Sequence, residues 1–92
     1  MHSNTPYTRH PYALTITLLI TAERQQRKYA NGTFEDAVYE VLNHAADLAG
    51  WSEERRADLY ARIAESVTAA DGIILMENKI NACLWQNEEQ PR

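Results

Sequence analysis

Apolar residues recur at helical spacing through the middle of the chain. After Thr33 they fall three or four positions apart, which places them on one face of an α-helix. That face holds Phe34, Ala37, Val38, Val41, Leu42, Ala45, Leu48 and Ala49. A second stretch follows Ser52, and its apolar face holds Leu59, Tyr60, Ile63, Val67 and Ala70. Because only a short turn joins the two predicted helices, we expect them to pack as an antiparallel hairpin.

Three glycines, Gly32, Gly50 and Gly72, separate the apolar stretches. Glycine readily adopts the left-handed conformation that ends a helix. Thr33 can cap the helix that follows Gly32, with Asp36 three residues on, and Ser52 can cap the helix that follows Gly50. The chain is therefore predicted to contain four segments of about helical length.

The first of these segments has two readings. Its apolar residues, Leu14, Ile16, Leu18 and Ile20, alternate with threonines, a pattern typical of a strand. At helical spacing a polar stripe forms instead from Thr17, Thr21, Arg24 and Lys28. The following run AERQQRK favours a helix. We predict a helix from Tyr12 to Ala30.

The last segment is apolar on more than one face. One helical face holds Ile73, Met76, Ile80, Cys83 and Leu84, and further apolar residues lie elsewhere, at Ile74, Leu75, Ala82 and Trp85. We predict a helix that is covered on both sides or presents apolar surface to a partner. The alternative is a β-hairpin that turns at residues 77–79.

These elements predict an all-α, four-helix domain built on the central hairpin. The alternative is an α+β domain with strands in the first and last segments. We expect residues 1–92 to form a single domain. Residues 1–11 are polar and contain two prolines, so we expect an extended arm that is ordered only where it docks. Residues 88–92 are expected to fray.

Composition limits the compartments and the classes of protein to which the chain can belong. The single Cys83 excludes an internal disulfide framework and favours a reducing cytoplasm. The apolar run 13–20 is far shorter than the roughly 20 residues of a membrane span. Charge is divided along the chain: residues 1–32 carry a net charge of +3 and residues 33–92 a net charge of −7. We expect the basic first segment to lie against acidic neighbours.

The polar clusters do not predict catalysis. Asp36, Glu40, His44 and Asp47 share one stripe of the second predicted helix, but this stripe points away from the apolar face. Metal sites in helical bundles project inward from several helices. Asp58 and Glu65 are likewise expected on the polar side of the third helix. We therefore expect no enzyme activity, no cofactor and no metal.

Protein recognition is the function that the pattern favours. An acidic ridge, defined as Asp36, Glu40 and Asp47, can guide the encounter with a basic surface, and apolar residues Trp51, Ile74 and Trp85 can anchor it. The apolar surplus of the last segment also predicts self-association as a homodimer.

The alternative function is weak nucleic-acid binding by a basic patch, defined as Arg24, Arg27 and Lys28. A helix-turn-helix in the central hairpin is disfavoured because Glu53 and Glu54 would meet the phosphates.

Two short stretches carry a resemblance. Ile20-Thr21-Ala22-Glu23-Arg24-Gln25-Gln26 and Gly32-Thr33-Phe34-Glu35-Asp36 resemble the opening of small uncharacterised proteins of bacteriophages and prophages. The resemblance covers about 17 residues and carries over no functional residue. It implies an origin in a mobile element, where small acidic proteins often look like inhibitors of host defence, including anti-CRISPR proteins. A phage-encoded inhibitor or regulator of a host nucleic-acid-handling complex is the expectation that follows.

Overall fold

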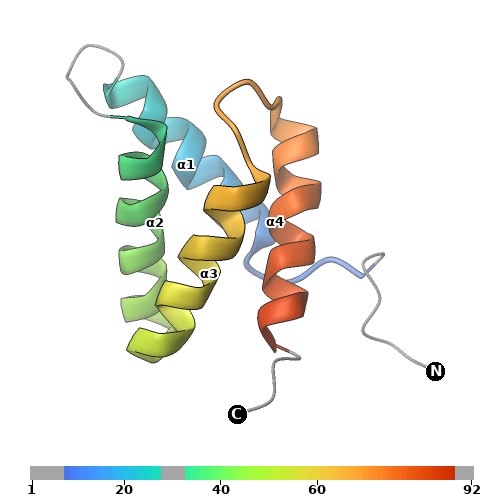
Figure 1. The fold of residues 1–92 in the computed structure, drawn as a ribbon. Helices are drawn as coiled ribbons and strands as arrows, with labels where there is room; N and C mark the ends of the chain where they lie inside the picture. Colours follow the sequence, from blue (N-terminus) through green and yellow to red (C-terminus); the bar gives the residue numbers. More distant parts are fainter. Residues whose placement is uncertain (1–7, 28–32, 89–92) are drawn as a thin grey trace.

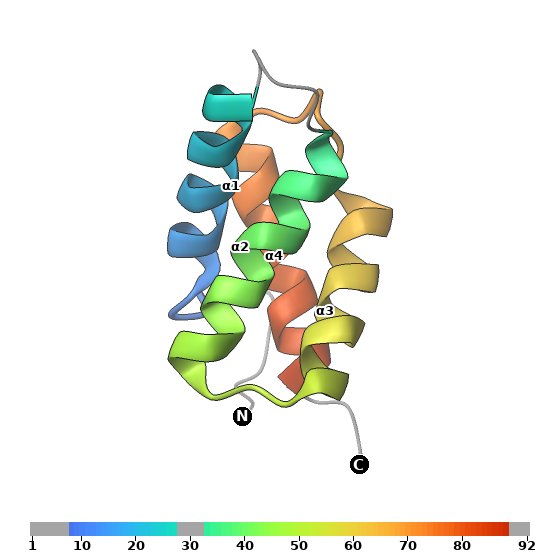
Figure 2. The ribbon, with the colours of Figure 1, turned by 90° about the vertical axis from the view of Figure 1, so that its left-hand side faces the viewer.

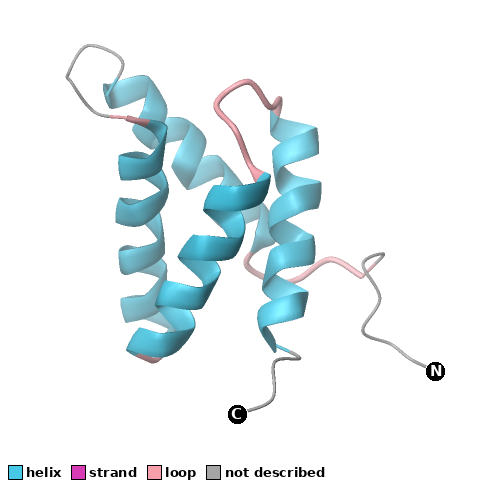
Figure 3. Cartoon of the chain, in the orientation of Figure 1, coloured by secondary structure: helices cyan, strands magenta, loops and turns pink. Residues whose placement is uncertain are grey.

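The chain folds into four helices in a computed structural model that describes residues 8–27 and 33–88 (Figure 1). They are α1 (Ala13–Arg27), α2 (Phe34–Ala49), α3 (Glu53–Ser66) and α4 (Ile73–Glu88). The described residues contain no strand (Figure 3). The predicted all-α, four-helix domain is confirmed, and the strands of the α+β alternative are absent from these residues. The predicted end of the first helix at Ala30 lies outside them.

The helices run alternately up and down around one core (Figures 1 and 2). Each packs against its neighbours in the sequence, and α1 also packs against α4, which closes the ring. The largest fully buried side chains come from all four helices: Ile16, Ile20, Val38, Leu42, Leu59, Ile63, Met76, Ile80 and Leu84. None of the four helices is long and apolar enough to cross a membrane.

The predicted start and end of α2 and the predicted start of α3 are confirmed. Thr33 and Asp36 form a reciprocal capping box, in which the Thr33 hydroxyl accepts a bond of 3.1 Å from the Asp36 N–H and the Asp36 carboxylate accepts one of 3.2 Å from the Thr33 N–H. Gly50 ends α2 in the left-handed conformation, at φ 74°. The Ser52 hydroxyl accepts a bond from the Arg55 N–H at the start of α3.

Two residues expected in the core are exposed. Leu48 is 75% exposed because it lies in the last turn of α2, which extends beyond the first turn of α1 (Figure 2). Ala70 is exposed because α3 ends at Ser66. Val67 has an extended backbone, so helical spacing no longer places the residues after it. The expected core position of each residue was therefore wrong.

The predicted polar stripe of α1 does not all face solvent. Thr17 is fully buried, and its hydroxyl donates to the Ala13 carbonyl oxygen at 2.8 Å. Thr21 repeats this bond one turn later, to Thr17. Bonding to the carbonyl four residues earlier satisfies a buried threonine hydroxyl inside a helix. This is how a segment with strand-like alternation forms a helix.

Replacing Gly50 with alanine should lower the free energy of unfolding by about 1 kcal/mol, because a Cβ disfavours the left-handed conformation. No atom lies within 4 Å of the added Cβ, so backbone strain is the whole effect. Gly50→Asn should cost less, since asparagine tolerates this conformation. Urea unfolding of the three proteins measures the difference. Equal stability of Gly50→Ala and the wild type would contradict the assigned helix end.

Candidate protein-binding surface

The acidic ridge lies on the face of α2 opposite the core. Asp36, Glu40 and Asp47 are all exposed, whereas Val38, Val41 and Ala45 on the other side are buried. Helix α2 carries four acidic residues and no lysine or arginine. The three side chains therefore share one exposed face of α2, and the helix fixes their spacing.

The three ridge residues differ in what they do for the fold. Asp36 belongs to the capping box and supports the start of α2. The Asp47 side chain has no hydrogen bond or ion pair with the described part of the chain. It also lies in the last turn of α2, which contains no basic residue. A negative charge there faces the negative end of the helix dipole, an arrangement that costs stability.

A shallow groove of about 320 Å³ lies beside the ridge, between α1 and α2. Its lining residues are Leu19, Ala22, Glu23, Gln26, Glu40, Val41 and His44. Glu40 thus belongs to both the ridge and the groove. The groove joins apolar and acidic side chains and contains no lysine or arginine among its lining residues.

The three apolar residues predicted as anchors are not brought together. Ile74 is 77% exposed at the start of α4, and Trp51 and Trp85 lie toward the opposite end of the bundle. Trp51 is half-buried, with its ring edge-to-face against Tyr12 at 5.6 Å and the Arg55 guanidinium over it. Trp85 covers His10, with the ring centroids 4.8 Å apart. Both tryptophans therefore have partners within the fold.

The basic patch is described only in part. Arg24 is half-buried, and its guanidinium lies 5.5 Å from the centroid of the Phe34 ring. Arg27 is the last residue of α1. Lys28 lies outside the described residues. The Arg24 contact joins the end of α1 to the start of α2, so this cation contributes to the packing of the two helices.

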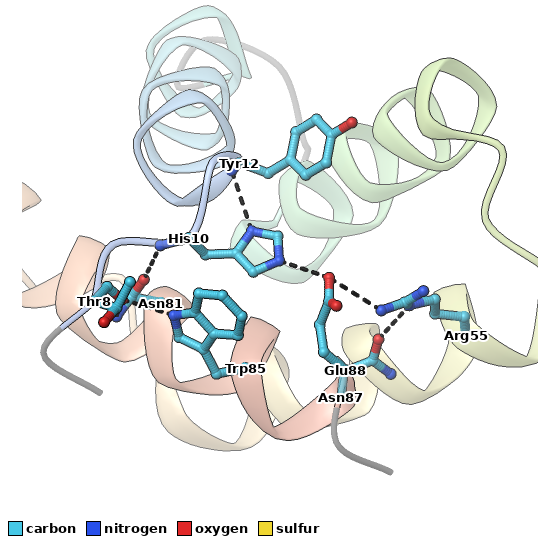
Figure 4. Close-up of polar contacts among 8 residues, drawn as sticks. All are labelled: Thr8, His10, Tyr12, Arg55, Asn81, Trp85, Asn87 and Glu88. Carbon is cyan, nitrogen blue, oxygen red and sulfur yellow. Dashed lines mark hydrogen bonds and ion pairs between the residues drawn. The ribbon is translucent and has the colours of Figure 1, made fainter. Parts of the chain in front are cut away.

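The arm, by contrast, holds a buried residue that sequence reasoning missed. His10 is only 5% exposed, and its ring packs against Trp85 (Figure 4). The backbone N–H of His10 donates to the Asn81 side-chain oxygen at 2.6 Å. The ring Nε2 of His10 lies 2.8 Å from the Glu88 carboxylate. Its Nδ1 accepts from the Tyr12 N–H, so the neutral ring carries its proton on Nε2. Thr8, Arg9 and His10 of the arm therefore contact α4.

Two side chains of α4 bind the backbone of the arm. Asn81, fully buried, donates to the Thr8 carbonyl oxygen at 3.2 Å, and the Trp85 indole N–H donates to the same oxygen at 2.7 Å (Figure 4). Arg9 donates to Asn78 on the same helix. A signal for this docking was present in the sequence: Asn81 interrupts an otherwise apolar part of α4, and a buried amide needs partners.

A polar network continues from Glu88 to α3. Arg55 contacts the Glu88 carboxylate at 3.2 Å and donates to Asn87, and Asn87 donates to Asp58 at 2.8 Å. Asp58 therefore lies between α3 and α4, not on the outer polar side where we expected it. Hydrogen bonds from Arg62, and then from Asn87, lower its pKa. Arg62 lies one turn from Asp58 on α3, but Asn87 belongs to α4, so the sequence did not reveal that Asp58 faces α4.

The pKa values of two further groups are shifted by their surroundings. The Thr68 N–H, and then Lys79, lower the pKa of Asp71. Burial raises the pKa of the Cys83 thiol, whose sulfur lies 3.3 Å from the Ser66 hydroxyl. Cys83 is thus held as the unreactive thiol. Within residues 8–27 and 33–88, no group of three His, Cys, Asp or Glu side chains is arranged to hold a metal ion.

Comparisons with models of known protein families, with curated protein sequences and with solved structures gave no match.

Replacing Asn81 with leucine should lower the free energy of unfolding by about 1–3 kcal/mol, because the His10 N–H loses its partner. The matched control is Asn78→Ala, which removes an exposed bond to Arg9 and should change stability by less than about 0.5 kcal/mol. Urea unfolding measures both, and hydrogen exchange of the His10 amide should quicken only in Asn81→Leu. Equal effects of the two variants would contradict the docking of the arm.

Acid should destabilise the protein through Asp58 and Asp71. A carboxyl whose pKa is lowered in the folded state stabilises the fold above its unfolded pKa, and this contribution is lost as the pH falls through the folded value. Stability should therefore fall as the pH drops below about 4. Asp58→Asn should be less stable near neutral pH and lose less stability in acid, whereas the control Glu65→Gln should follow the wild type. An unchanged acid profile in Asp58→Asn would refute this account.

Proposed function

We propose that this protein is a small protein-binding module that recognises a basic surface of its partner through the acidic ridge. The observation that supports this most directly is Asp47, an exposed acid without a described partner at the end of α2. A residue kept where it costs stability is a candidate for a role in binding.

Acids elsewhere in the bundle contribute to its folding. Glu53 and Glu54 lie in the first turn of α3, where negative charge is favourable. Glu53 also pairs with Arg56, and Asp58 with Arg62. The basic residues of α3 are thus engaged within the chain, whereas Asp47 of α2 is exposed without a described partner.

Leu48 extends the proposed surface with an apolar contact. It follows Asp47 and is 75% exposed at the end of the ridge. Charge steers two proteins into contact, and apolar side chains at the centre of an interface contribute much of the binding free energy. A basic surface with an apolar position beside it is therefore the partner chemistry that we propose.

The finer proposal is that the partner belongs to a host nucleic-acid-handling complex and that the protein is a phage-encoded inhibitor or regulator in the cytoplasm. Proteins that handle nucleic acids present basic channels, because binding depends on neutralising phosphates. An acidic helix face offers such a channel charges of the same sign as a phosphate backbone. We propose binding, not catalysis, as its mode of action.

Replacing Asp47 with lysine should weaken partner binding at least about tenfold while raising the free energy of unfolding by about 0.3–1 kcal/mol, since lysine suits the end of a helix. The matched control is Glu65→Lys, which makes the same charge change at an exposed position of α3. Asp36→Lys is unsuitable because it would break the capping box.

Affinity capture from a nuclease-treated bacterial lysate, with the wild type and both variants as baits, provides the measurement. The partner should be captured by the wild type and Glu65→Lys and lost from Asp47→Lys. Equal capture by all three proteins would remove the acidic ridge from the interface, and recovery of nucleic acid alone, in lysate not treated with nuclease, would favour the basic patch.

A further inference from the structure

One face of α4 binds residues 8–10 of the arm, which we call the docked tripeptide. Its contacts come from four side chains, Asn78, Asn81, Trp85 and Glu88. Because these residues recur three or four positions apart, they lie along one side of the helix. A short segment of the chain thus occupies a built site on α4.

This site contacts the backbone of the docked tripeptide as well as one of its side chains. The Asn81 amide accepts from the His10 N–H at 2.6 Å and donates to the Thr8 carbonyl oxygen at 3.2 Å (Figure 4). The Trp85 indole donates to the same carbonyl oxygen. The His10 ring packs against Trp85 and lies 2.8 Å from Glu88. The ligand of this site is therefore a three-residue segment ending in histidine.

Only Pro11 and Tyr12 connect the docked tripeptide to α1, and both are exposed. A segment that is exchanged between identical chains forms the same contacts in its new place, so exchange is a low-cost route to a dimer. The bonds that exchange would open lie in this short link. They are the bonds to His10 from the Ala13 N–H at 3.1 Å and from the Tyr12 N–H at 3.2 Å.

The start of α1 carries apolar surface beside this link. Leu14 and Leu18 are 49% and 48% exposed, and they share a face because they are one turn apart. The three chain steps from His10 to Ala13 span at most about 11 Å. A second copy that received the tripeptide would therefore lie next to the start of α1. Covering the two leucines of each copy would offset the bonds lost in the link.

We infer that two copies of this chain exchange their docked tripeptides. Each tripeptide binds α4 of the other copy, and Leu14 and Leu18 of α1 become buried between the copies. The second copy thus completes the site on α4. This surface belongs to the arm, α1 and α4, whereas the acidic ridge belongs to α2, so the inference does not rest on the proposed function.

Two variants of the full chain each lack a different half of the contact. Asn81→Leu keeps the tripeptide and loses the site, whereas His10→Ala keeps the site and loses the ring that fills it. Sedimentation equilibrium should give a wild-type dimer with a dissociation constant below about 1 mM. Each variant alone should associate at least about tenfold more weakly.

Mixing the two variants separates exchange from docking within one chain. The ¹⁵N-labelled His10→Ala protein should show a shifted Trp85 indole signal when unlabelled Asn81→Leu is added, because His10 of the added chain reaches the intact site. Unlabelled His10→Ala is the matched control and should leave that signal in place.

The apolar face is tested separately, with variants that leave the tripeptide and its site intact. Leu18→Gln should weaken dimerisation about tenfold. The control Leu48→Gln makes the same change at a 75% exposed position of α2 and should dimerise like the wild type.

Four results would overturn the inference. A wild-type dissociation constant above about 1 mM would exclude the dimer. Equal dimerisation of the wild type, Asn81→Leu and His10→Ala would place the interface elsewhere on the bundle. An unshifted Trp85 signal in the mixture would show that the tripeptide docks only on its own chain. Normal dimerisation of Leu18→Gln would remove the face of α1 from the interface.

Discussion

The packing of α1 against α4 is the contact on which the other features depend. It joins the first and last helices and closes the ring of helices around one core. The bond from the His10 N–H to the buried Asn81 side chain fixes where the arm ends and α1 begins. Once α1 is held in this position, its other side meets α2 and forms the groove. A contact far from the candidate surface thus determines its shape.

The fold was predictable because its local signals agree. Thr33, Asp36, Gly50 and Ser52 mark the ends of the central helices, and the apolar positions between them recur at helical spacing. The first segment was harder, because its threonines alternate with apolar residues. Their hydroxyls bond to carbonyl oxygens inside α1, and this internal satisfaction cannot be read from alternation alone.

The polar interior was less predictable than the fold. The sequence placed His10 in a polar arm and Asp58 on an outer face, but both are held by residues more than 25 positions away. Helical periodicity reports which face a residue occupies and says nothing about which neighbouring helix covers that face. The outward direction of the ridge could be predicted without knowing the neighbouring helices, because it follows from the position of the α2 core residues alone.

The distribution of acids separates those that the fold uses from Asp47. Acids at the starts of α2 and α3 stabilise those helices, and Asp58 and Asp71 pair with cations. Stability alone therefore accounts for their sign and position. It does not account for Asp47, where a neutral or basic residue would suit the helix end better. The same helix supplies Glu40 to the groove, so α2 carries both this unexplained acid and part of the lining of the groove.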